Sequence, residues 1–157
     1  MTIKNCFCGS GLTFEQCCQG LINGEVAAKN AEALMRSRFS AYVIKNYQYI
    51  LLTYASTQRA QLTVSELANS SLDTHWLSLQ VLAHHVQKST AQVEFKAFYQ
   101  VDNGYFVMHE LSDFVFEAGK WLYTSGVIQN GSGKFFPERN SQCLCASGKK
   151  FKKCCGA

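Results

Sequence analysis

Residues 93–114 read VEFKAFYQVDNGYFVMHELSDF, and this stretch decides the fold. In its first half, Val93, Phe95 and Ala97 alternate with charged residues, which is the period-two pattern of a strand with one buried face. The triplet DNG at residues 102–104 is a strong turn signal between two such runs. The stretch therefore predicts an antiparallel hairpin.

The same alternation extends to both sides of this hairpin. Before it, Leu77, Leu79, Val81 and Ala83 alternate with polar residues such as His84. After it, the segment EAGK at residues 117–120 predicts a further turn into WLYTSGVI, residues 121–128. We therefore expect a meander of at least four antiparallel strands. The sequence NGSG at residues 130–133 then indicates a flexible linker.

Helices are expected before the sheet. Asn30 can cap a helix that runs to about Tyr47 and carries one apolar stripe. Arg36 and Arg38 lie at opposite borders of this stripe, either as two rim arginines or with one of them in a pocket as an anion clamp. The pattern T-x-x-E at residues 63–66 is a capping box, so a second helix begins near Val64. Helices followed by an antiparallel sheet define an α+β fold.

The register of the central hairpin decides which polar residues share a face. A two-residue turn at Asn103–Gly104 places Glu110 opposite Ala97, whereas a three-residue turn at residues 102–104 places His109 there. A slip of one residue moves every side chain to the other face, and both registers remain open. The polar candidates for a pocket are Arg38, His85, His109 and Glu110, with His84 and Asp113 nearby in the sequence.

All eight cysteines fall in two stretches with the same spacing. Residues 6–18 read CFCGSGLTFEQCC and residues 143–155 read CLCASGKKFKKCC, and the two share seven of thirteen positions. The predicted metal ligands are Cys6, Cys8, Cys17 and Cys18 in one copy and Cys143, Cys145, Cys154 and Cys155 in the other. The glycine after the shared serine permits a sharp bend, and the shared phenylalanine is expected to dock each copy on the body.

Zinc explains this pattern better than disulfides do. Adjacent cysteines have Cα atoms about 3.8 Å apart, below the usual disulfide range of roughly 4.4–6.8 Å. Four sulfur ligands suit tetrahedral Zn²⁺, with an iron–sulfur cluster as the alternative. Because protein ligands fill every position, each site is expected to be structural, and two Zn²⁺ ions are predicted, one for each cluster.

Positive charge is concentrated at the C-terminal end. The net charge is +4, and the segment from Lys134 to Lys153 alone contributes +5. Lys149, Lys150, Lys152 and Lys153 stand inside the second cysteine stretch, where the first has no lysine. These lysines either form a solvated face or dock an anionic partner such as ribosomal RNA or an acidic protein surface. Because they offset thiolate charge, the N-terminal cluster is expected to lose metal first.

The spacing, with GSG or ASG and the closing CC, resembles the SEC-C motif. That motif is the zinc-binding tail of the translocase ATPase SecA, where it contacts the chaperone SecB and the ribosome. The stretches AEALMRSRFSAYV, VEFKAFY, HELSDF and GKWLYTSG resemble the bacterial YchJ family. This resemblance implies a cone-shaped domain like nuclear transport factor two, at residues 21–130. It also implies zinc knuckles at residues 1–20 and, after a linker, within residues 131–157.

A binding role is favoured over an enzymatic one, and no catalytic residue is assigned. No Ser-His-Asp order, phosphate loop or H-E-x-x-H pattern is present. The expected function is a zinc-binding interaction protein that docks on the translation or protein-export machinery through the basic C-terminal knuckle. The alternatives are a small-molecule-binding or catalytic cone and a thiol redox or metal-relay protein. With no secretory h-region and no apolar run long enough for a membrane span, a cytoplasmic location is expected.

Overall fold

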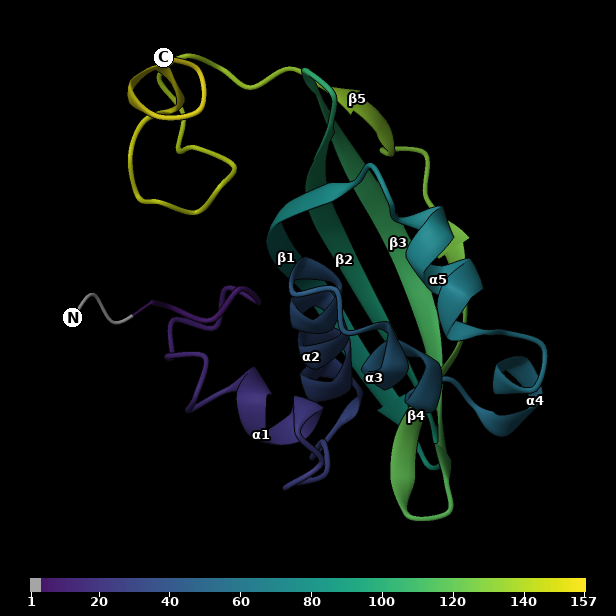
Figure 1. The fold of residues 1–157 in the computed structure, drawn as a ribbon. Helices are drawn as coiled ribbons and strands as arrows, with labels where there is room; N and C mark the ends of the chain where they lie inside the picture. The colour runs from purple at the N-terminus through teal and green to yellow at the C-terminus, as the bar shows by residue number, and fades with distance from the viewer. Residues whose placement is uncertain (1–3) are drawn as a thin grey trace.

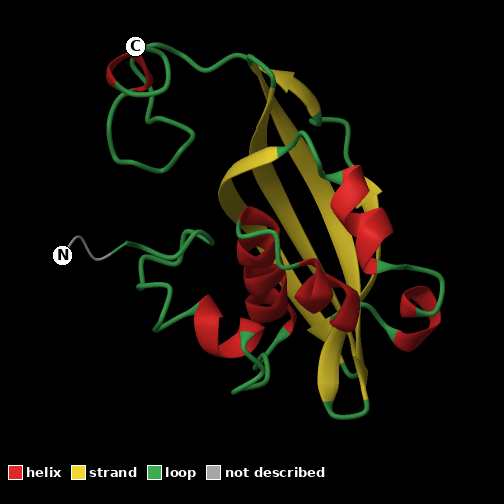
Figure 2. Cartoon of the chain, in the orientation of Figure 1, coloured by secondary structure: helices red, strands yellow, loops and turns green. Residues whose placement is uncertain are grey.

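The computed structural model describes residues 4–157 as a curved antiparallel sheet with helices on its concave face (Figures 1 and 2). The N-terminal segment lies beside these helices, whereas the C-terminal segment lies apart from them, beyond one end of the sheet. This arrangement confirms the expected α+β architecture. Among the described residues, no helix has the length and apolarity needed to cross a bilayer.

The sheet is a meander with one short additional strand. Its order is β1-β2-β3-β4, and β5 pairs with β3. The strands are β1 (His75–Gln87), β2 (Thr90–Val101), β3 (Gly104–Glu117), β4 (Lys120–Ile128) and β5 (Gly133–Phe135). Because β5 pairs with Tyr105–Val107 while β4 pairs with Glu110–Glu117, the two occupy successive parts of the same edge of β3. The expected linker is thus partly a strand.

Within residues 4–157, five α-helices and one 3₁₀ turn accompany the sheet. They are α1 (Cys18–Ile22), α2 (Ala31–Val43), α3 (Tyr47–Leu52), α4 (Ser56–Arg59), α5 (Val64–Ser70) and the 3₁₀ turn η1 (Phe151–Lys153). The predicted caps are present: the Asn30 side chain accepts from the Ala33 amide, and Thr63 and Glu66 form a reciprocal capping box. The helix predicted to run to about Tyr47 ends at Val43, because Lys45 adopts φ of 61°, and a separate helix, α3, begins at Tyr47.

The core lies between α2 and the concave face of the sheet. Phe39 from α2 packs against Phe95 from β2 and Phe114 from β3, and all three are fully buried. Cys6, Cys8 and Cys18 belong to the same buried cluster. The N-terminal cysteine segment is therefore part of the body's core, and α1 crosses the domain boundary expected at residue 20.

The register of the central hairpin differs from both expected registers. The turn consists of Asp102 and Asn103, with Val101 paired to Gly104, and Asp102 adopts φ of 52°. Ala97 consequently faces Met108, and Glu110 lies opposite Phe95 on the buried face. The observed turn begins one residue earlier than the expected two-residue turn and is one residue shorter than the expected three-residue turn.

A register shift within β1 changes the face of its second half. Val81 pairs with the buried Phe95, but after a shift between Val81 and Ala83 it is His84 that pairs with the buried Val93. Ala83 and His84 thus exchange the faces that simple alternation predicted for them. The extra residue of a bulge has this effect because the side-chain period of a strand is two.

Removal of the α2 cap provides a test of this part of the fold. Asn30→Ala deletes the side-chain acceptor for the Ala33 amide, so we expect the free energy of unfolding to fall by about 1 kcal/mol. Urea denaturation followed by circular dichroism measures this change. Asn69→Ala, at an exposed helical position in α5, is the matched control and should change stability much less. Equal losses in the two variants would contradict a capping role for Asn30.

Candidate metal centres and the cone cavity

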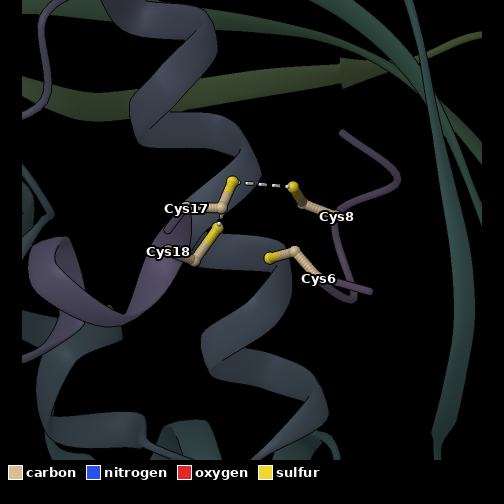
Figure 3. A group of neighbouring side chains, drawn as sticks. All are labelled: Cys6, Cys8, Cys17 and Cys18. Carbon is tan, nitrogen blue, oxygen red and sulfur yellow. Dashed lines mark hydrogen bonds between the residues drawn. The ribbon is translucent and has the colours of Figure 1, made fainter. Parts of the chain in front are cut away.

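The first cysteine cluster is built from a loop and the start of α1. The sulfurs of Cys6, Cys8, Cys17 and Cys18 all lie within 4.8 Å of one another and point toward a common centre (Figure 3). Cys6 and Cys8 come from the loop, and Cys18 is the first residue of α1, on the side facing α2. Four convergent sulfurs at this spacing can hold one tetrahedral metal ion.

The second cluster repeats this geometry. The sulfurs of Cys143, Cys145, Cys154 and Cys155 also lie within 4.8 Å of one another. In each copy the amide of the first cysteine donates to a carbonyl six residues later, at 2.7 Å for Cys6 and 2.8 Å for Cys143. Two copies with different sequences at nearly half of their positions therefore share one backbone fold.

The shared serine and glycine explain the tight loop. The hydroxyl of Ser10 accepts from the Leu12 amide, and that of Ser147 accepts from the Lys149 amide. Gly11 and Gly148 adopt φ of 84° and 78°, in the left-handed region that glycine occupies without a Cβ penalty. These contacts confirm the turn that the sequence predicts between the second and third cysteines.

The N-terminal cluster is anchored on α2. Arg36 donates to the Cys8 carbonyl at 2.7 Å, and the Cys6 sulfur lies 3.6 Å from the Ser40 hydroxyl. Phe14 packs against the core cluster and meets Phe7 edge-on. Arg36 is thus a rim arginine with a task that the sequence did not reveal, because its partner is a backbone carbonyl that lies 28 residues earlier.

The C-terminal cluster has much less contact with the body. Phe151 meets Tyr105 of β3 edge-on, with ring centroids 5.6 Å apart. Cys155 is exposed, as are Lys149, Lys150 and Lys153, while Lys152 is half-buried. No acidic side chain within residues 4–157 forms an ion pair with any of these lysines. Their charge therefore faces solvent.

The thiols of each cluster influence one another's protonation. A hydrogen bond from Cys18 lowers the pKa of Cys6 well below its usual value, and the same bond raises the pKa of Cys18. In the second cluster, partial desolvation of the Cys155 thiol together with a hydrogen bond to Cys143 raises the pKa of Cys155 to about 12. Metal binding must displace the protons that these bonds share, so it depends on pH.

A second candidate site is a cavity of about 240 Å³ between α2 and the sheet. Both Arg38 and Glu110 line it, so two of the four predicted pocket residues come together. His109, the neighbour of Glu110 on β3, faces the opposite side and bonds Glu94 at 2.8 Å. His85 lies with Asp113 in a broader surface groove. His109 lies outside the cavity because strand neighbours alternate in face, and His85 lies outside it because its part of β1 lines the groove instead.

The cavity also contains residues that the sequence did not single out. Tyr42, Tyr54, Trp76 and Tyr123 form aromatic walls, and the Tyr123 hydroxyl donates to Glu110 at 2.9 Å. They come from α2, the segment after α3, β1 and β4, so the packing of the helical segment on the sheet and the register of the strands together bring them to one cavity. In the sequence, an aromatic residue that lines a cavity cannot be distinguished from one that fills the core.

Helices on a curved antiparallel sheet, with a four-cysteine cluster at each end of the chain, define a protein with a nuclear transport factor two-like domain and SEC-C motifs. The family description "YchJ, middle NTF2-like domain" matches residues 30–126, and "SEC-C motif" matches residues 139–157. The chain belongs to the YchJ family, whose curated relatives are named UPF0225 proteins.

Relatives match along nearly the whole chain. A UPF0225 protein from Actinobacillus succinogenes is 39% identical over 154 residues, covering 97% of this chain and 96% of the relative. Another from Shewanella sp. is 39% identical over 161 residues, with the same coverage.

Two solved structures share the fold. A SEC-C motif containing protein from Rhodopseudomonas palustris has a TM-score of 0.77 and 32% identity, covering 81% of this chain and all of its own. A second one, from Psychrobacter arcticus, has a TM-score of 0.69 and 34% identity, covering 99% of this chain and 97% of its own.

The environments of the two clusters predict the order in which they release metal. In a metal-loaded chain, the N-terminal site should hold its ion longer, because Cys6, Cys8 and Cys18 are buried and Arg36 ties down the loop. This order reverses the expectation drawn from the lysines. Release into excess chelator can be followed by the absorbance of a chromogenic metal indicator.

Two variants that each keep only one metal site show which site releases its ion in which phase. The variant Cys143→Ser/Cys145→Ser retains only the N-terminal site and should release metal several-fold more slowly than Cys6→Ser/Cys8→Ser. Equal rates, or faster release from the N-terminal site, would refute the assigned order.

Proposed function

We propose that this chain is a zinc-binding interaction protein without enzymatic activity, which docks on the translation or protein-export machinery through its C-terminal knuckle. The observation that carries the proposal is the contrast between two equivalent clusters. One is built into the core, and the other presents Lys149, Lys150 and Lys153 to solvent without an acidic partner among the described residues.

Zinc is the metal that fits both clusters best. Each offers four sulfurs and no open position, which is the form of a structural zinc site rather than a catalytic one. None of the eight cysteines is joined in a disulfide within the described residues, which suits a reducing cytoplasm, where we place the protein. The match of the SEC-C motif to residues 139–157 supports the same metal, because that motif binds zinc in SecA.

Docking through the C-terminal knuckle follows from its charge and exposure. Ammonium groups beside a zinc–thiolate centre offset its net charge, and four of them exceed that need. Structural metal fixes the loop, so the lysines are presented from a rigid frame at the end of the chain. An anionic surface, such as ribosomal RNA or an acidic protein of the export machinery, is the partner that this charge selects.

Metal content tests the first part of the proposal. The protein purified without added metal should contain two zinc ions for each chain, as measured by elemental mass spectrometry. The variant Cys143→Ser/Cys145→Ser should contain one, because the remaining two cysteines of that cluster cannot complete a tetrahedral site. Iron with sulfide in place of zinc would contradict the assignment.

Charge removal tests the docking face. Replacement of Lys149, Lys150, Lys152 and Lys153 by glutamine should abolish salt-sensitive binding to purified ribosomes or export components. If all four lysines contact nucleic-acid phosphates, the slope of log affinity against log salt should fall by about 3. Sedimentation of the labelled protein with ribosomes at several salt concentrations measures both quantities.

The matched control carries the same change in net charge elsewhere. Lys29, Lys45, Lys88 and Lys120 are also exposed, and their replacement by glutamine should leave the salt slope unchanged. Similar losses in both variants would show that only net charge matters and would sink the proposed docking face.

A further inference from the structure

The cavity of the cone holds two buried charges that do not pair with each other. Only 3% of Arg38 and 8% of Glu110 are exposed, and both line the cavity. Across the described chain, no carboxylate lies within the 4.0 Å of Arg38 that defines an ion pair. A buried charge without a counter-charge is costly, so this arrangement needs a physical reason.

Arg38 uses only part of its hydrogen-bonding capacity. Its Nη1 donates to the Ile50 carbonyl at 3.0 Å and to the Thr53 hydroxyl at 2.6 Å. The guanidinium also lies over the rings of Tyr54 and Tyr123, whose centroids lie 4.6 and 4.4 Å from the guanidinium carbon. Within residues 4–157, no hydrogen bond engages Nε or Nη2. These two nitrogens form the planar fork that matches a carboxylate.

Glu110 is also held in place and only partly used. Its Oε1 accepts from Ser112 at 2.7 Å and from Tyr123 at 2.9 Å, whereas Oε2 has no partner among the described residues. The carboxylate occupies the space that a side chain at Gly126 would take, since an added Cβ there would meet Oε1. The fold thus reserves a place for an acceptor inside an apolar layer.

The remaining walls are aromatic and carry further donors. The indole nitrogen of Trp76 is buried without a hydrogen-bond partner in the described structure, and Trp76 lines the cavity. Burial raises the pKa of Tyr42 to about 12, and burial with the neighbouring Glu110 raises that of Tyr123. The O–H of Tyr123 already donates to Glu110, so the indole N–H of Trp76 is the donor in these walls that the described structure leaves without a partner.

We propose that the cone cavity binds a small carboxylic acid that has an apolar or aromatic body and a hydroxyl donor. The carboxylate binds the Nε–Nη2 edge of Arg38, the hydroxyl donates to Oε2 of Glu110, and the body lies against Trp76. With about 240 Å³, the cavity is smaller than the roughly 300–1,000 Å³ of sites for drug-sized ligands, so the ligand is a small metabolite. This site is independent of the metal centres and of the basic knuckle.

Mandelate is a suitable probe because it carries a carboxylate, a hydroxyl and a phenyl ring. Phenylacetate lacks the hydroxyl, and methyl mandelate lacks the charge. The chain has two tryptophans, so the indole N–H resonance of Trp76 reports on the cavity and that of Trp121, outside it, is an internal control. In the wild-type protein, mandelate should shift the Trp76 resonance more strongly than either analogue and leave Trp121 unchanged.

Two variants assign the contacts. Arg38→Gln should weaken mandelate binding about tenfold and remove the preference for mandelate over its methyl ester. Arg38 also donates to Ile50 and Thr53, so its replacement can disturb the fold as well as the site, and a second variant is needed. In Glu110→Gln, the amide oxygen of the glutamine can still accept from Ser112 and Tyr123. It should remove the preference for mandelate over phenylacetate while leaving phenylacetate affinity within about twofold.

The proposal is overturned if mandelate at about 10 mM leaves the Trp76 resonance in place, or if methyl mandelate binds equally well. It is also overturned if Glu110→Gln leaves the preference for mandelate over phenylacetate intact. Zinc content and ribosome sedimentation of both variants should match the wild type, so failure of the cavity and failure of the docking knuckle are separate results.

Discussion

Helix α2 is the element on which both the N-terminal cysteine cluster and the cavity depend. Residues two apart on a helix point in directions about 200° apart, so Arg36 and Arg38 reach opposite sides. Arg36 ties the N-terminal cysteine loop to the helix, whereas Arg38 enters the cavity under the sheet. Phe39 fills the core between them. One helix therefore positions both the N-terminal cysteine loop and the charged group of the cavity.

The two cysteine clusters show how one local fold can serve two purposes. The hydrogen-bonding pattern is the same in both, down to the serine that accepts an amide two residues later. Even the left-handed position occupied by Gly9 in the first copy is kept by Ala146 in the second, with φ of 59°. The two clusters differ in their surroundings. The N-terminal cluster packs against α2 and the core, whereas the C-terminal cluster lies beside solvent-facing lysines.

Local features of this fold follow from the sequence, and long-range features do not. The helix caps at Asn30 and Thr63, the strand alternation in β2 and both cysteine clusters depend on residues close together in the chain, and the structure confirms them. The break in the first long helix at Lys45 has no glycine or proline to mark it.

The cavity was harder to predict because it depends on the register of the sheet. The turn at Asp102–Asn103 decides that Glu110 faces inward and His109 outward. The shift in β1 decides that His84 lies on the same face as the buried Val93. Arg38 was recognisable as a candidate clamp from its place on the helical stripe. Trp76 and Tyr123 were not, since their role arises only when four elements meet.

The close approach of Gly126 to Glu110 limits what position 126 can carry. A side chain on β4 at this place would meet the end of the Glu110 side chain, which would have to move. The carboxylate would then leave its hydrogen bonds with Ser112 and Tyr123. The interior acid on β3 therefore keeps its present place only because the facing residue on β4 has no side chain.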